Sequence, residues 1–429
     1  MKGKQMRLKS GCILGVILCF LASAAVCSAA QDLTWSQCVQ EAAKNHPDLI
    51  AAVESIKQSQ AVKQETASGL YPQISANLSA QASKSSSANK QTNTYAYGVS
   101  GSQLIFDGIK TINNVRAAGE SIKASQQGYR FTSSEVRLRL RTAFINLLKA
   151  QEMVKVTGEI VKIRRDNLEL ITLSYESGLE HKGALLTTQA DLASANFQLA
   201  QAKRDIELAQ HQLVKEMGLK EFKRLSVTGD FKVNETASEK PDFDVLADKH
   251  PSLLQAAAQK NAAEFSLRST YGNFFPNLSV QAGADKTGPR WSPANSQWDL
   301  GAFLSLPLFE GGLRTAQLSQ AKALYNQLEA SERSTRDGLI VGLSSAWVSL
   351  QDAVETVDVQ NKQLLAAQER SKIAEAEYST GFISYDNWTI IEDNLVRAKT
   401  DYLSAQAEAL LAEASWIQAK GENLEYAQN

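Results

Sequence analysis

The chain of 429 residues contains the same pattern twice, and this internal repeat restricts its possible folds more than any other feature. NHPDL, which begins at residue 45, recurs as KHPSL, so that His46 and His250 are 204 positions apart. YPQISANLSA, LIFDG and YESGL recur as FPNLSVQAGA, LPLFEG and YSTGF at offsets of 203 or 204. A repeat of this length predicts two tandem copies of one structural unit.

Long helices dominate each copy. No proline occurs from about 109 to 177, and apolar residues recur there at alternating intervals of four and three, as in the seam of a coiled coil. A helix of about 69 residues would be ~100 Å long. The pattern returns from about 312 to 380, and Gly178 and Gly381 end the two long helices. Each unit is predicted to be helix, strand, strand, long helix and shorter helix, with the two shorter helices stacked end to end beside the long one.

The repeat also sets the predicted domain boundaries. We assign residues 1–30 to a cleaved signal peptide, 31–221 to the first repeat, 222–242 to a linker, 243–421 to the second repeat and 422–429 to a short tail. The linker is polar and interrupted by Gly and Pro, with one short strand expected near 225–231.

The N-terminus predicts export. Four basic residues precede the apolar run GCILGVILCFLASAAV, and small residues follow up to Ala30. The run is shorter than the ~20 residues of a spanning helix, and no later run of about 18 apolar residues exists. Lipid attachment at Cys27 is disfavoured because Ala24 and Val26 stand where Leu and a small residue are required. Cleavage would leave Cys38 as the only cysteine, without a disulfide partner.

Two stretches alternate polar and apolar residues with a period of two. QISANLSAQAS covers residues 73–83, and NLSVQAGAD covers 277–285. Their partner strands, TYAYGVSGSQ and QWDLGAFLSL, add Tyr95, Tyr97 and Trp298. Such strands with flanking aromatic residues are typical of an outer-membrane β-barrel. The alternative is two surface hairpins that each bury one face on their own helices.

Four strands are too few for a barrel, since the smallest transmembrane barrels have about 8. An open edge in lipid leaves backbone groups unsatisfied, so the strands are expected to close with those of other copies. A dimer would give 8 strands, a trimer 12 and a tetramer 16. Small polar residues on the inner face favour a barrel with an open lumen; they are Ser75, Ser79, Ser83, Ser100 and Ser102.

Taken together, these motifs resemble the TolC-type outer-membrane efflux protein family. The resemblance rests on the doubled units, the strands introduced by YP and FP, the LIFDG and LPLFEGG passages, and the YxxGL and YxxGF breaks, over residues 32 to 420. It implies mainly α structure with transmembrane β: a homotrimer whose 12-stranded barrel in outer-membrane lipid continues into a periplasmic α-helical barrel. It also implies docking to a periplasmic adaptor protein and an inner-membrane RND or ABC transporter, in a Gram-negative envelope.

The sequence gives no support for an enzyme. The four histidines, His46, His181, His211 and His250, are scattered, and a role at helix starts is favoured over metal binding for His46 and His250. No HExxH, GxSxG or phosphate-binding loop occurs, so no metal or cofactor is expected. The formal net charge of −1 does not indicate the basic surface that nucleic-acid binding requires.

The candidate sites are mechanical. The turns after the long helices would form the periplasmic mouth and contact the adaptor through Tyr175, Gly178, Leu179, Tyr378, Gly381 and Phe382. A pore constriction is predicted on the final helix, where two pairs spaced by seven share a face: Asp386 and Asp393, and Asn387 and Asn394. The alternative is an ordinary solvated helix face.

At the constriction the sequence departs from the family pattern. The resemblance implies acidic residues where Asn387 and Ile390 stand, and a basic residue where Ile383 stands, although Tyr378 is kept. The predicted function is an exit duct for tripartite efflux or type I secretion. A structural or adhesive trimeric coiled-coil protein of the envelope is the alternative.

Overall fold

The computed structural model describes residues 31–85, 90–233 and 240–427. The predicted signal peptide, including Cys27, lies outside the described residues. The first repeat contains, in order, β1 (Gln31–Leu33), α1 (Trp35–Asn45), α2 (Pro47–Ser68), β2 (Gln73–Ser85), β3 (Lys90–Phe106), α3 (Lys110–Glu176) and α4 (Lys182–Glu216). The short strand β4 (Leu225–Val227) follows.

The second repeat contains α5 (Phe243–Lys249), α6 (Pro251–Gly272), β5 (Asn277–Gly288), β6 (Asn295–Ser305), α7 (Leu313–Ser379) and α8 (Tyr385–Ala419), and a single 3-10 turn, η1 (Leu424–Ala427), ends the described chain. The helix–strand–strand–long helix–helix order of both repeats is confirmed. The two long helices, α3 and α7, have 67 residues each. In the described residues, no helix is both long and apolar enough to cross a membrane.

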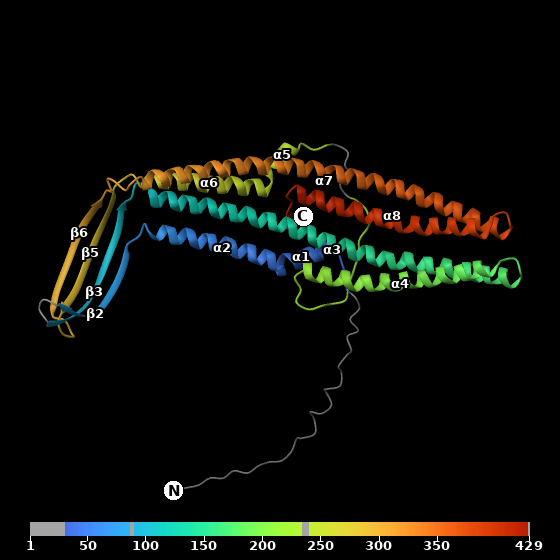
Figure 1. Cartoon of the computed structure of the whole chain (residues 1–429), viewed down its shortest axis with the longest axis horizontal. Coiled ribbons are helices and arrows are strands. Elements are labelled where there is room, and N and C mark those ends of the chain that lie inside the picture. Colours follow the sequence, from blue (N-terminus) through green and yellow to red (C-terminus); the bar gives the residue numbers. More distant parts are fainter. Residues whose placement is uncertain (1–30, 86–89, 234–239, 428–429) are drawn as a thin grey trace, which may run out of the picture.

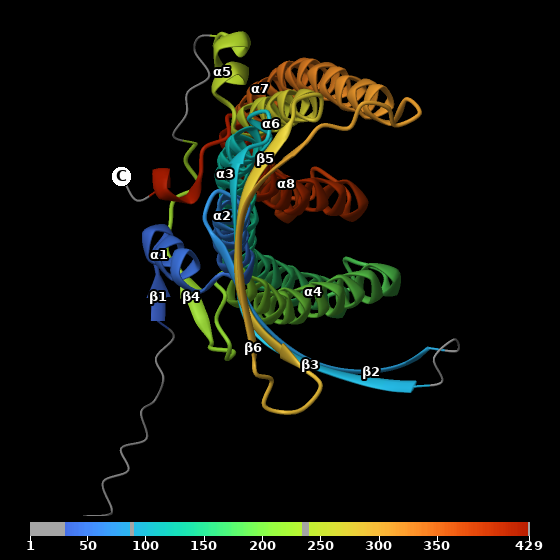
Figure 2. The ribbon, with the colours of Figure 1, turned by 90° about the vertical axis from the view of Figure 1, so that its left-hand side faces the viewer.

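The helices form one curved layer. α3 packs against α2 along one half of its length and α4 along the other, while α7 packs in the same way against α6 and α8 (Figure 1). The predicted stacking of two shorter helices beside each long one is therefore confirmed. Contacts of α3 with α6 and α8 join the repeats. Viewed along the helices, the layer is an open arc with α4 and α7 toward its two ends (Figure 2).

A four-stranded antiparallel sheet stands at one end of the helices, in the order β2-β3-β5-β6. The register places Ala76 beside Val99, Val99 beside Ala284, and Ala284 beside Trp298, so one face is apolar across all four strands. The opposite face is polar, and on it Ser75 and Ser100 exchange a hydrogen bond of 2.9 Å between their hydroxyls. The alternation in the sequence thus becomes two chemically distinct faces.

The sheet has two unpaired edges. Among the described residues, β2 and β6 each have a partner strand on one side only. Large apolar side chains of the apolar face, among them Ile74, Leu78 and Leu304, are exposed. Neither the edges nor the apolar face is covered by the helices of this chain, which stand beyond the end of the strands (Figure 1).

A small group of short elements lies on one side of the helical layer, near the middle of the helices (Figure 2). β1 pairs in parallel with β4, and α1, α3, α4 and η1 enclose the largest apolar core, which contains Val39, Leu140 and Leu213. The strand expected over 225–231 covers Leu225–Val227 alone, and the short helices α1 and α5 were not predicted. Cys38 is fully buried in this core, where burial raises the pKa of its thiol to about 12.

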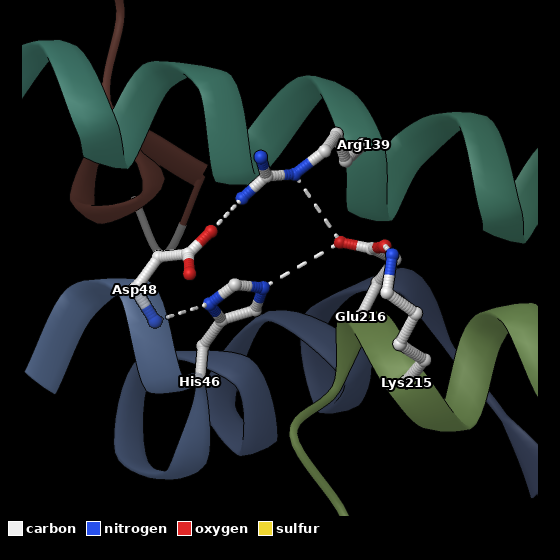
Figure 3. Close-up of polar contacts among 5 residues, drawn as sticks. All are labelled: His46, Asp48, Arg139, Lys215 and Glu216. Atoms are coloured by element: carbon white, nitrogen blue, oxygen red, sulfur yellow. Dashed lines mark hydrogen bonds and ion pairs between the residues drawn. The ribbon is translucent and has the colours of Figure 1, made fainter.

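An ionic cluster joins α2 and α4 end to end on α3 (Figure 3). Glu216, the last residue of α4, accepts from Lys215 at 2.8 Å and lies 3.4 Å from the Nε of Arg139. The same carboxylate lies 3.5 Å from Nε2 of His46, and Arg139 also pairs with Asp48. The joint between the stacked helices α2 and α4, where the end of α4 meets the start of α2, is therefore held together by ionic contacts.

Candidate functional site

Both helical hairpins, α3–α4 and α7–α8, turn at the end opposite the sheet (Figure 1). Gly178 and Gly381 have φ values of 74° and 78°, a conformation that glycine adopts without steric cost. The amide of Leu179 donates to Ser174 O at 2.9 Å, and that of Phe382 donates to Glu377 O at 2.8 Å. These bonds satisfy carbonyls at the helix ends and project the next side chains outward. Leu179 and Phe382 are 81% and 84% exposed.

One predicted tip residue connects the two hairpins. The hydroxyl of Tyr378 on α7 donates to Glu180 in the first turn at 2.8 Å. Its ring stacks on Trp388 of α8, with centroids 4.6 Å apart. Burial, followed by the hydrogen bond to Glu180, raises the pKa of Tyr378, so the hydroxyl keeps its proton and remains a donor. The equivalent Tyr175 of the first repeat is exposed instead.

A small core lies directly behind this contact. Ile171, Ala184, Ala374, Tyr385 and Trp388 are buried together and come from all four helices of the hairpins. The hydroxyls of Tyr385 and Thr188 share a hydrogen bond of 2.8 Å across the interface. The Nε1 of Trp388 is buried without an acceptor among the described residues. The hairpins are thus packed together near their tips by aromatic and small apolar side chains.

A charged cluster lies further from the tips. Arg164 of α3 is buried and forms an ion pair with Asp393 of α8. Asp191 of α4 is close to both: its pKa is raised by burial and by Asp393, and lowered by Arg164. Lys399 of α8 reaches Glu159 of α3 at 2.8 Å. These contacts make the hairpin interface electrostatic as well as apolar.

The predicted constriction residues do not all have the same surroundings. Asp386, Asn387 and Asn394 are exposed on α8, away from its buried residues. Asp393 is exposed as well, but its carboxylate is bound to Arg164. Ile390 is exposed on the same side. Of the two acidic residues predicted at the constriction, Asp386 is therefore the one without an ion-pair partner among the described residues.

Three residues of the interface between the hairpins were not predicted from the sequence: Glu180, Arg164 and Asp191. Arg164 gave a signal, because it interrupts an otherwise apolar seam and a buried guanidinium requires an acceptor. Glu180 follows the tip glycine by two positions, which the sequence alone does not connect with a tyrosine 198 residues later. Asp191 carries no local pattern that would single it out.

Three of the four histidines act at helix starts. Nδ1 of His46, His181 and His250 accepts from the amides of Asp48, Ala184 and Ser252 at 3.2, 3.0 and 3.1 Å. The interpretation of His46 and His250 as helix-start residues is therefore confirmed. His211 instead stacks on Phe222, with centroids 4.0 Å apart.

Comparison with known proteins identifies the class. The profile of the family described as outer membrane efflux protein matches residues 38–219 and 244–422. Efflux protein BepC of Brucella suis is 21% identical over 359 residues, which cover 82% of this chain and 74% of that protein. Outer membrane protein TolC of Escherichia coli is 22% identical over 68% of this chain and 62% of its own length.

Solved structures agree in fold. The CmeC outer membrane channel of Campylobacter jejuni superposes with a TM-score of 0.80 at 18% identity, covering 90% of this chain and 85% of CmeC. The MtrE outer membrane channel of Neisseria gonorrhoeae in its open state superposes with a TM-score of 0.80 at 17% identity. The match covers 91% of this chain and 89% of MtrE. The long helices and four strands are thus the architecture of outer-membrane channels.

The chain belongs to the outer membrane efflux protein family. It is an outer-membrane efflux channel of the TolC type from a Gram-negative envelope, and it is a transport protein rather than an enzyme. Membership of this family excludes the alternative of a structural or adhesive coiled-coil protein.

Proposed function

We propose that three copies of the chain form one continuous duct, with a 12-stranded barrel in the outer membrane and an α-helical barrel in the periplasm. The single observation that carries this proposal is the open arc. Both of its lateral margins are incomplete, in the sheet at β2 and β6 and in the helical layer at α4 and α7. Further copies of the chain would pair the edge strands and cover the lateral helices at the same time.

The lateral helices support this assembly. α7 exposes Val341, which is 68% accessible, and also Val348 and Ile373, whereas the equally long α3 exposes few of its large apolar side chains. On the other margin, α4 exposes Phe197 and Leu208. Apolar surfaces on both margins are expected where α7 of one copy packs against α4 of the next. The unpaired backbone of β2 would similarly find β6 of a neighbour.

Within this duct the hairpin tips form the periplasmic entrance. We infer that Leu179 and Phe382, with Tyr175, Gly178, Tyr378 and Gly381 behind them, contact a periplasmic adaptor that links the channel to an inner-membrane RND or ABC transporter. Asp386, Asn387, Asp393 and Asn394 on α8 are proposed to line the constriction. The contacts Tyr378–Glu180 and Arg164–Asp393 hold the two hairpins together, so their release would widen the entrance.

The names of the relatives refer to different exported substrates. One is the alkaline protease secretion protein AprF of Pseudomonas aeruginosa, 23% identical over 74% of this chain and 69% of its own length. Both tripartite efflux and type I secretion are therefore proposed for this chain, with the duct passive and the transporter supplying the energy.

The assembly is tested by measuring the mass of the mature protein in detergent by light scattering, together with single-channel conductance in planar bilayers. We expect a mass of three chains and a conducting pore. A stable monomer, or a trimer that never conducts under any applied voltage, would refute the proposed duct.

A further inference from the structure

The acidic residues of the strands lie on one face at the far end of the sheet. β5 begins next to α6, so its last residues lie at the end of the sheet away from the helices. Lys286 and Lys84 both lie on the apolar face there, whereas Asp285 and Asp299 lie on the polar face. Closer to the helices, from Leu278 to Ala284, the apolar face carries no charged residue in any of the four strands.

Lys286 lies at the rim of a shallow apolar groove. The groove has a volume of about 750 Å³ and crosses all four strands. Its apolar floor and walls come from Leu78, Tyr97, Val99, Ala284 and Trp298. Register pairing places Lys286 directly between Tyr97 of β3 and Ser296 of β6, about 5 Å from each at Cβ. A cation therefore stands at one end of a groove whose interior is apolar.

Aromatic rings mark the depth of this groove in the membrane. Trp291, in the turn between β5 and β6, packs against Tyr95 and Tyr97 with centroids 6.4 and 6.0 Å away. Trp298 is 79% exposed on the same apolar face. Tyr and Trp on the outer surface of a barrel lie at the level of lipid headgroups. Lys286 is thus at headgroup level, while the groove runs toward the acyl chains.

We propose that this groove is a binding site for the phosphate headgroup of an anionic outer-membrane lipid, with the Lys286 ammonium on the phosphate and the acyl chains over Val99 and Ala284. The proposal rests on the closed trimeric barrel proposed above, which turns the apolar face toward lipid. No carboxylate of the described residues forms an ion pair with Lys286. Asp285, the neighbour of Lys286 in β5, and Asp299 lie on the opposite face, where they disfavour a phosphate close to this part of β5.

The test uses the full-length trimer in detergent, incubated with phosphatidylglycerol or with diacylglycerol of the same acyl chains, and native mass spectrometry to count bound lipid. Lys286→Gln should lower phosphatidylglycerol binding about fivefold, as expected for loss of one basic group at a membrane surface. Lys286→Arg should keep most of the binding, because it retains the charge. Diacylglycerol binding should be weak and equal in all variants.

Two control variants separate a site from general attraction. Lys322→Gln removes an exposed charge on α7, and Lys84→Gln removes the other lysine of the apolar face outside the groove. Both should bind phosphatidylglycerol like the wild type. The proposed site is overturned if Lys286→Gln binds as much phosphatidylglycerol as the wild type. It is also overturned if either control variant loses as much binding as Lys286→Gln. The same spectra report the number of chains, so a monomer would instead refute the trimeric barrel, and the site with it.

Discussion

At the scale of single residues, the Tyr378 hydroxyl is a direct link between the two hairpins. Tyr378→Phe removes its bond of 2.8 Å to Glu180 but keeps the ring stack on Trp388. A hydrogen bond to a partly exposed charged acceptor contributes about 1 kcal/mol, so the open form should become about fivefold more populated. Single-channel recording should show longer open times. Tyr175→Phe, at the equivalent exposed position, is the control and should leave them unchanged.

Asp191 should make the same interface sensitive to pH. Its pKa is raised in the folded protein, first by burial and then by Asp393. The folded state therefore binds more protons than the unfolded state, and stability falls as the pH rises from the ordinary Asp value of ~3.9 through the raised pKa. Asp191→Asn should remove this loss. Thermal melts from pH 4 to 7 should show a smaller decrease for Asp191→Asn than for wild type, whereas Asp166→Asn on the exposed side of α3 should follow wild type.

At the scale of elements, the two repeats join their stacked helices differently. Glu216 is buried between α2 and α4 with three basic partners, as Figure 3 shows. The offset of 203 places Ala419 and Gly342 where Glu216 and Arg139 stand in the first repeat. The second joint instead has His250 against Phe131, and burial lowers the pKa of that imidazole. The first joint thus depends on a buried carboxylate that has no equivalent in the second.

This difference predicts which joint a single substitution weakens. Glu216→Ala leaves Arg139 and His46 without their shared acceptor and should lower the free energy of unfolding by about 1–3 kcal/mol. Amide hydrogen exchange should accelerate in the first turn of α2, where Asp48 is also held by Arg139. Glu207→Ala, on the exposed side of the same helix, is the matched control. Equal protection of α2 in both variants would show that the ionic cluster does not support the joint.

The elements that could be predicted are those with a local signal. Periods of two and of alternating three and four residues identify strands and long helices, and the offset identifies the repeat, because each pattern depends on neighbours in the chain. α1 and α5 are too short for such periods, and β1 and β4 pair across 194 residues, from Asp32 to Ser226. The tip glycines follow from sequence. The pairing of Arg164 with Asp393 does not, because it depends on how the hairpins pack.

At the scale of the whole molecule, the two faces of the sheet should respond oppositely to a new charge. Ala80 and Val280 lie on the apolar face, and Ser79 and Gln281 on the polar face. An arginine facing lipid near the membrane midplane costs ~2–4 kcal/mol, whereas one in a water-filled lumen stays hydrated. Ala80→Arg and Val280→Arg should therefore reduce the yield of trimer in outer-membrane fractions more than Ser79→Arg and Gln281→Arg. Equal yields would mean that the apolar face does not meet lipid.

The proposed trimer would also bring three copies of α8 together, and their charges should then set the ion preference of the pore. Asp386 is exposed and free of ion pairs among the described residues, whereas Arg164 neutralises Asp393. Three unpaired carboxylates around one axis attract cations, but three neutralised ones do so only weakly. Asp386→Asn should therefore lower the cation preference measured by reversal potentials in planar bilayers, with the trimer intact. Asp393→Asn should leave the preference nearly unchanged and instead lengthen open times, because Arg164 loses its partner on the other hairpin. The reverse assignment of the two effects would place Asp393, and not Asp386, on the pore axis.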